Sequence, residues 1–135
     1  MRKLLLTALI VGLRLSACSG YTQSGMRESE HQNLSGGDLT VRIKSASGSA
    51  TKYIDVGGSA WQGLDAEVTL SVGSGSYKIE LLGEDDAVTL ALEAAAGETV
   101  NGTGWMGLDS FDKASYRVTA VDARDVEYTI VYTFR

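Results

Sequence analysis

Hydrophobic and polar residues alternate along much of this chain. Leu39, Val41 and Ile43 alternate with polar residues, and the strongest period-two pattern covers residues 126–134. Such alternation is typical of β-strands that bury one face. Further strands are expected over residues 53–56, 67–72, 77–81, 88–92, 98–103 and 116–120. About eight strands at this spacing predict an all-β domain over residues 38–135, an antiparallel Greek-key β-sandwich.

Clusters of turn-forming residues separate these strands. Gly73-Ser74-Gly75-Ser76, residues 83–86 and residues 122–125 are rich in Gly, Ser or Asp, so we predict tight turns there. Ala91 to Ala96 could also form a helical turn. Gly97 and the β-rich flanks favour a strand at this place.

A short phrase occurs twice. Gly58-Ser59-Ala60-Trp61-Gln62-Gly63-Leu64-Asp65 returns as Gly102-Thr103-Gly104-Trp105-Met106-Gly107-Leu108-Asp109, and the two phrases contain both tryptophans of the chain. A repeat at this distance suggests two similar four-strand halves, packed face to face with Trp61 and Trp105 in equivalent loops.

The two tryptophan loops are the candidate binding loops, with Trp61, Asp65, Trp105 and Asp109 as their candidate residues. An exposed indole ring suits stacking on a sugar or anchoring a partner protein. Alternatively, each Trp folds back to close an open end of the sandwich while Asp caps a turn. An exposed Trp without a partner is costly, which favours the second interpretation.

Composition limits the classes of function. The chain has 135 residues, 16 glycines, no proline, one cysteine and one histidine, and its net charge is −5. This length supports one modest core. The acidic balance excludes a sequence-wide basic surface for nucleic acid. A single cysteine excludes an intrachain disulfide, and a single histidine excludes most histidine-based sites.

The first residues have the pattern of an export signal. Arg2 and Lys3 precede an apolar run from Leu4 to Leu13, which is too short to span a membrane. Leu15-Ser16-Ala17-Cys18 follows and resembles the bacterial lipobox. This resemblance implies a lipoprotein signal peptide over residues 1–17, cleavage before Cys18, and lipidation of Cys18. Arg14 departs from the usually apolar approach to the lipobox.

The same resemblance implies a location in the cell. Ser19, rather than Asp, follows the cysteine, which by the sorting rule of Gram-negative lipoproteins suggests the outer membrane, with the domain in the periplasm. Residues 18–37 are rich in Ser, Gly, Gln and Glu, so we expect a lipidated N-terminus followed by a flexible tether, with a solvated His31. The mature chain would carry nine basic and 17 acidic residues.

A second, local pattern bears on the fold. Asp112-Lys113-Ala114-Ser115-Tyr116 has the form D-x-A-x-Y and resembles the entry to strand F of immunoglobulin-like domains; residues 116–121 are similar to that strand in fibronectin type III domains. The resemblance covers about ten residues and implies an immunoglobulin-like sandwich, with Tyr116 as the tyrosine corner. Alternatively, Tyr116 is an ordinary core aromatic residue.

The sequence contains few of the residue patterns that are typical of enzymes. With its only histidine in the expected tether, the domain lacks a Ser/His/Asp set. Asp pairs at 85/86, 109/112 and 122/125 lack the spacing of a calcium-binding loop, and Asp is common in polar turns. We predict no metal site, no cofactor and no catalysis. The sequence favours a cell-envelope lipoprotein that binds glycan or protein, or that has a structural role; the alternative is a periplasmic inhibitor of a hydrolase.

Overall fold

The computed structural model describes residues 20–57 and 61–135. Their strands are β1 (Tyr21–Ser24), β2 (Arg27–Gln32), β3 (Gly36–Asp55), β4 (Gly63–Leu82), β5 (Val88–Ala95), β6 (Thr99–Gly107) and β7 (Lys113–Phe134). One short 3₁₀ turn, η1 (Glu84–Asp86), links β4 to β5. In this described part of the chain, no helix has the length and apolar character needed to cross a membrane.

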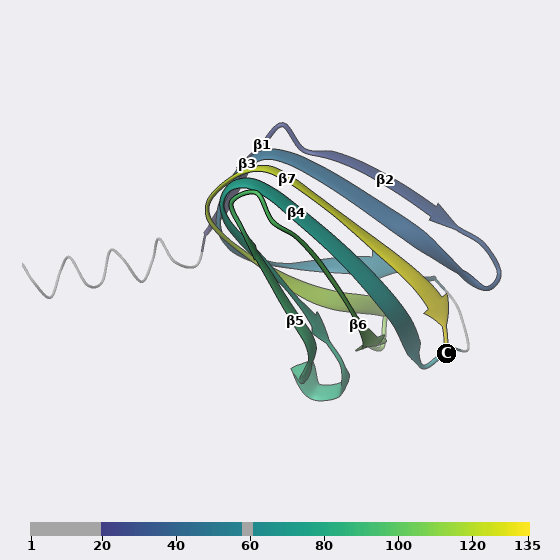
Figure 1. Cartoon of the computed structure of the whole chain (residues 1–135). Helices are drawn as coiled ribbons and strands as arrows, with labels where there is room; N and C mark the ends of the chain where they lie inside the picture. The colour runs from purple at the N-terminus through teal and green to yellow at the C-terminus, as the bar shows by residue number, and fades with distance from the viewer. Residues whose placement is uncertain (1–19, 58–60) are drawn as a thin grey trace, which may run out of the picture.

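The strands form one antiparallel sheet that bends over on itself. Its order is β1-β3-β7-β4-β5, while β2 pairs with β3 and β6 pairs with β4. Three long strands therefore pass through both layers of the resulting sandwich (Figure 1). The first layer contains β2, β6 and the parts of β3, β4 and β7 near residues 36–43, 63–72 and 126–134. The predicted antiparallel β-sandwich is confirmed.

The bends occur at residues with left-handed backbone conformation. Gly48 has a φ of 100° and Gly75 a φ of 73°, and the pairing register shifts beside both. Asp122 and Asp125 have positive φ values at the bend of β7. An extra residue in one strand bends a sheet without ending it. Residues 73–76 and 122–125 are therefore bends within strands, where the sequence pattern predicted turns between strands.

Alternation places the core between the two layers. Inward-facing side chains of the three long strands are fully or almost fully buried, among them Leu39, Leu70, Tyr77, Val118 and Ile130. Within the described residues, no polar or charged residue other than tyrosine belongs to this buried set. Hydrophobic burial between the two arms of one bent sheet is thus the main stabilising interaction.

The segment after residue 19 differs from the expected tether. Tyr21 to Ser24 and Arg27 to Gln32 pair with β3 as regular antiparallel strands. All six residues of β2 are exposed, because β2 lies at a sheet edge where its inner face is uncovered. A strand without a buried face shows no hydrophobic alternation, which is why composition alone suggested flexible chain.

The structure also corrects the expectation of two four-strand halves. β3 and β4, from the first half of the domain, both pair with β7 from the second half. The two halves share one sheet, so they do not form separate units that pack face to face.

Candidate functional site

The described residues of the two copies of the repeated phrase, 61–65 and 102–109, meet at the open end of the sandwich, opposite the bends. β4 and β6 pair so that Gly63 faces Gly107, Leu64 faces Met106 and Asp65 faces Trp105. A Cβ atom on Gly63 would stand 2.5 Å from the Met106 carbonyl oxygen. The shared glycine at this position of the phrase therefore allows two backbones to approach closely.

Trp61 lies in the connection between β3 and β4. Its ring stacks on Phe134 with the ring centroids 5.3 Å apart and the planes inclined by 18°. The side chain is 43% exposed. Trp61 thus covers the end of β7 and also presents surface to solvent, which combines parts of both interpretations of the tryptophan loops.

Trp105 lies within strand β6, not in a loop as predicted. The adjacent Met106 points into the core, and the half-buried Trp105 alternates with it. The Thr89 hydroxyl accepts a hydrogen bond from the Trp105 backbone N–H at 3.1 Å and donates one to its carbonyl oxygen at 2.5 Å. The Arg135 guanidinium carbon lies 5.1 Å from the centroid of the indole ring. The backbone and the ring of Trp105 are therefore both held in place.

Asp65 completes this arrangement on the neighbouring strand. Its carboxylate lies 3.4 Å from an Arg135 guanidinium nitrogen, so Arg135 contacts both Asp65 and Trp105. A shallow groove of about 430 Å³ follows β4, β6 and β7 here. It is lined by Asp65, Ala66, Glu67, Thr103, Gly104, Trp105, Val131 and Thr133.

Asp109 has a different role. Its side-chain oxygen accepts hydrogen bonds from the backbone N–H groups of Phe111 at 2.8 Å and Lys113 at 3.1 Å. These bonds shape the connection between β6 and β7, as Asp commonly does in turns. Of the four predicted binding residues, the groove brings together Asp65 and Trp105, whereas Trp61 and Asp109 lie outside its lining.

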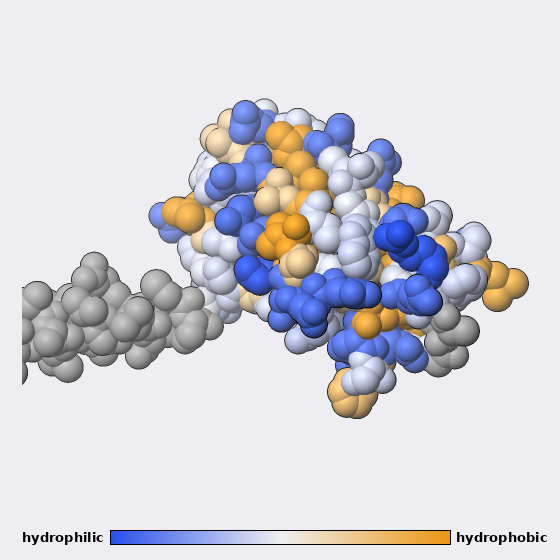
Figure 2. Space-filling view, turned by 90° about the horizontal axis from the view of Figure 1, so that it is seen from below, coloured by the Kyte–Doolittle hydropathy of each residue, from blue (hydrophilic) through white to orange (hydrophobic). Residues whose placement is uncertain are grey.

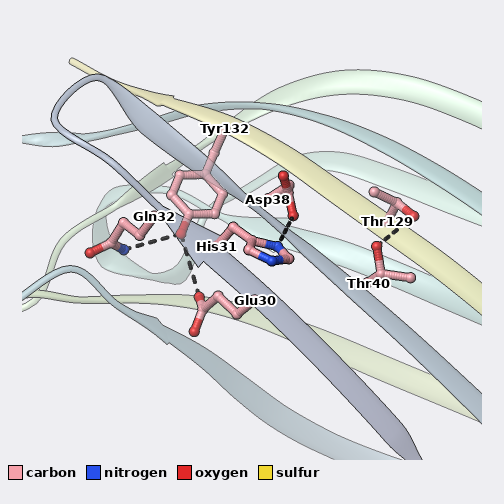
Figure 3. A network of polar contacts seen from close by, with 7 residues as sticks. All are labelled: Glu30, His31, Gln32, Asp38, Thr40, Thr129 and Tyr132. Atoms are coloured by element: carbon pink, nitrogen blue, oxygen red, sulfur yellow. Dashed lines mark hydrogen bonds and ion pairs between the residues drawn. The ribbon is translucent and has the colours of Figure 1, made fainter.

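A polar network at the β2–β3 hairpin could not be recognised in the sequence (Figure 3). The Tyr132 hydroxyl accepts a hydrogen bond from the Gln32 side-chain amide at 3.1 Å and donates one to the Glu30 carboxylate at 3.4 Å. Partial burial raises the pKa of Glu30, and the Tyr132 hydrogen bond lowers it to a smaller extent. His31 lies 3.3 Å from Asp38 across the two strands. Only the long-range pairing of β7 with β3 brings Tyr132 to Gln32 and Glu30.

The groove lining contains an aromatic ring, carboxylates and hydroxyl groups that can bind a ligand, and it contains no histidine. His31 is the only histidine of the chain, and it lies exposed on β2, outside the groove lining. Asp85, Asp86, Asp112, Asp122 and Asp125 all have positive φ values, so they occupy turn and bend positions that Asp tolerates. Among residues 20–57 and 61–135, no three His, Cys, Asp or Glu side chains are placed to hold a metal ion.

Two further predictions have different outcomes. Cys18 lies outside the described residues, so its lipidation stays a prediction. The hydroxyl group of Tyr116 contacts that of Tyr128 at 3.0 Å inside the core. In a tyrosine corner the hydroxyl bonds to the backbone, so Tyr116 is better described as a core aromatic residue.

Comparisons with known proteins give a fold and no family. No protein-family model matches the chain, and no curated protein matches it. A solved structure of Bacillus endospore appendages, described as disulfide-linked pili, has a TM-score of 0.52 at 15% identity, covering 80% of this chain and 89% of that one. The CBM22-1 xylan-binding domain of Paenibacillus barcinonensis Xyn10C has a TM-score of 0.37 at 12% identity, covering 86% and 85%. At these identities the first likeness shows a shared sandwich fold alone.

Proposed function

We propose that this chain is a lipid-anchored, non-catalytic binding module of a bacterial cell envelope, and that the groove beside Trp105 binds a neutral carbohydrate. The observation that carries the proposal is the combination of groups in one shallow groove: an indole ring, two carboxylates and two threonine hydroxyls. Sugars present apolar C–H faces and a rim of hydroxyl groups, which such a combination can contact at the same time.

The aromatic and polar side chains of the groove provide the two kinds of contact that a sugar requires. The indole of Trp105 offers apolar area for a pyranose ring, while Asp65 and Glu67 can accept hydrogen bonds from sugar hydroxyls. Thr103 and Thr133 can both donate and accept. Arg135 orients Asp65 and Trp105 before a ligand arrives, which reduces the entropy lost on binding. The acidic groups disfavour anionic glycans.

The proposed anchor is consistent with the position of this groove. Gly20 enters the fold beside Gly48, at the bend, whereas the Asp65–Trp105 pair lies near the opposite end of the strands. Lipidation of Cys18 would therefore hold the bent end towards the membrane and leave the groove accessible. The Cys18→Ser variant tests the proposed lipid anchor. This variant should move from the membrane fraction to the soluble fraction. Unchanged membrane association would contradict lipidation.

Titration calorimetry with neutral chito-, cello- and malto-oligosaccharides tests the groove. We expect binding to at least one series, with Trp105→Ala weakening it by about tenfold or more, in line with the loss of one aromatic contact. Trp105→Phe should retain part of the affinity, and Trp61→Ala should change it little. Equal losses from Trp61→Ala and Trp105→Ala, or no binding by the wild type, would contradict the proposal.

The alternative, a periplasmic hydrolase inhibitor, predicts a different result. Such a protein would depress the activity of a lysozyme-type or protease-type enzyme in an assay, whereas a glycan-binding module would leave enzyme turnover unchanged at saturating substrate.

Circular dichroism of the Trp105 and Trp61 variants serves as the folding control, because Trp105 is partly buried against its neighbours.

A further inference from the structure

The β2–β3 hairpin carries a feature that the carbohydrate groove does not explain. Leu34 lies at its tip with 95% of the side chain exposed. In Figure 1 this hairpin projects at the end of the molecule opposite the N-terminal entry. Figure 2 shows a small apolar projection at that same right-hand end, separate from the hydrophobic areas in the middle of this face. A fully exposed leucine offers apolar surface to a partner, because burying it would stabilise a complex.

The tip is held rigidly. The side-chain oxygen of Asn33 accepts hydrogen bonds from the Ser35 N–H at 2.9 Å, the Ser35 hydroxyl at 3.0 Å and the Gly36 N–H at 3.0 Å. The Asn33 N–H also donates to the Gly36 carbonyl oxygen at 2.8 Å. These four bonds close the turn around Leu34, so little conformational entropy is left for a complex to remove.

The base of the hairpin is fixed to the rest of the fold. The Phe134 N–H donates to the Ser35 carbonyl oxygen at 3.0 Å, and the Gln32 side-chain amide donates to the Asp55 carbonyl oxygen at 3.3 Å. The Tyr132 network and the His31–Asp38 pair connect β2 with its neighbours (Figure 3). Hydrogen bonds to neighbouring strands therefore fix the hairpin that carries Leu34, and Leu34 does not lie on a mobile loop.

Charge around the hairpin indicates the kind of partner. Glu28, Glu30, Asp38 and Asp55 lie on or beside it. Partial burial is the main cause that raises the pKa of Glu30, and the carboxylates of Glu28 and Asp55 raise it further. Arg27 and His31 are the two basic residues of β2, and Arg42 of β3 lies opposite Arg27, where it forms an ion pair with Glu127. We propose that Leu34 inserts into a leucine-sized apolar pocket of a partner protein, and that basic residues surround this pocket.

A protein fits this surface better than a membrane does. One leucine side chain contributes only about 1.5–3 kcal/mol on burial, which is too little to hold a domain on a bilayer. The acidic groups beside it are repelled by anionic lipid. A concave protein site can combine the apolar contact with ion pairs at its edge, in the manner of other interface anchors.

Site-specific crosslinking in intact envelopes tests this inference. The photoreactive residue p-benzoylphenylalanine replaces the exposed Ser35, beside Leu34, in one variant and the exposed Thr51, on the other layer, in the control, so that Leu34 itself stays in place. We expect a protein adduct at position 35 that is absent at position 51. No position-specific adduct, or an adduct with lipid alone, would overturn the inference.

The captured protein is then purified and its affinity measured. Leu34→Ala should weaken binding by about tenfold or more, Leu34→Met should retain most of it, and added salt should weaken it. Asn33→Ala, which loosens the tip while keeping Leu34, should weaken binding severalfold. Unchanged affinity in Leu34→Ala would overturn the inference. Trp105→Ala should leave this interaction intact, so failure here and failure of the carbohydrate proposal can be told apart.

Discussion

Four tyrosine side chains connect the two layers of the sandwich. The rings of Tyr77 and Tyr128 stack with centroids 5.9 Å apart, and the Tyr116 ring meets Tyr128 edge-on. Hydroxyl groups pair between Tyr116 and Tyr128 at 3.0 Å and between Tyr21 and Tyr77 at 3.1 Å. Each pairing satisfies polar atoms that burial would otherwise leave without a partner. The cluster thus combines aromatic packing with polar contacts in the core.

These tyrosines should make the fold sensitive to alkali. Burial raises the pKa of Tyr77, Tyr116 and Tyr128 above the ordinary value of a tyrosine. The stability that depends on their protonation is fully present below the unfolded pKa of about 10 and is lost as the pH rises above it, because the unfolded chain releases these protons first. Tyrosinate absorbance should therefore rise together with loss of the β-sheet dichroism signal.

A variant separates this effect from general alkaline damage. Tyr128→Phe removes one of the buried ionising groups, so its unfolding transition should depend less steeply on pH. Ionisation of all three buried tyrosines near pH 10 with an unchanged dichroism spectrum would show that the cluster is open to water.

At the scale of elements, the bends decide the architecture. Gly75 has a φ of 73°, and a Cβ atom there would stand 2.1 Å from the Asp122 carbonyl oxygen of the neighbouring strand. Gly97 has a similar φ of 78°, but a Cβ atom there would meet nothing within 4 Å. The two glycines therefore share a left-handed backbone conformation, but only a side chain at Gly75 would collide with the backbone of a neighbouring strand.

This contrast gives a matched pair of variants. Gly97→Ala should lower the free energy of unfolding by about 1–2 kcal/mol, the cost of a left-handed alanine. Gly75→Ala should cost clearly more, about 3 kcal/mol or above, because backbone must move to relieve the clash. Urea denaturation of both variants measures the difference. Similar losses in the two would indicate that β4 does not bend tightly against β7.

The long strands also show what the sequence could and could not reveal. Alternation at Leu39–Ile43 and at residues 126–134 was enough to predict strands and their buried faces. Gly75 and Asp122 looked like turn residues because positive φ serves a hairpin turn and a bulge equally well. Only the pairing of distant segments, such as β4 with β7, distinguishes the two.

The first two strands provide a separate test. Amide hydrogen exchange should show protection in β1 and β2 where their N–H groups bond to β3, with faster exchange in the Gly25–Met26 connection between them. Flexible chain exchanges without protection, so complete exchange throughout residues 21–32 within the dead time would contradict their pairing with β3.

In the whole molecule, the proposed anchor and the two proposed binding surfaces lie towards opposite ends. The chain enters at the bent end, and both the Trp105 groove and the Leu34 hairpin lie towards the open end. The repeated phrase indicated the importance of this end, but its pattern did not reveal that Gly63 and Gly107 face each other or that Trp105 lies in a strand. The alternation of β6 could not be recognised because Gly102 and Gly104 occupy its inward positions, against Leu90 of β5.

A titration followed by nuclear magnetic resonance tests the central claim, that the groove beside Trp105 is the carbohydrate site. Adding the oligosaccharide that binds best should shift the signals of Asp65, Glu67, Thr103 and the Trp105 indole, and these shifts should disappear in Trp105→Ala. Signals of the core and of the Leu34 tip should stay in place. Shifts confined to Trp61 and Phe134, or spread evenly over the surface, would contradict the claim.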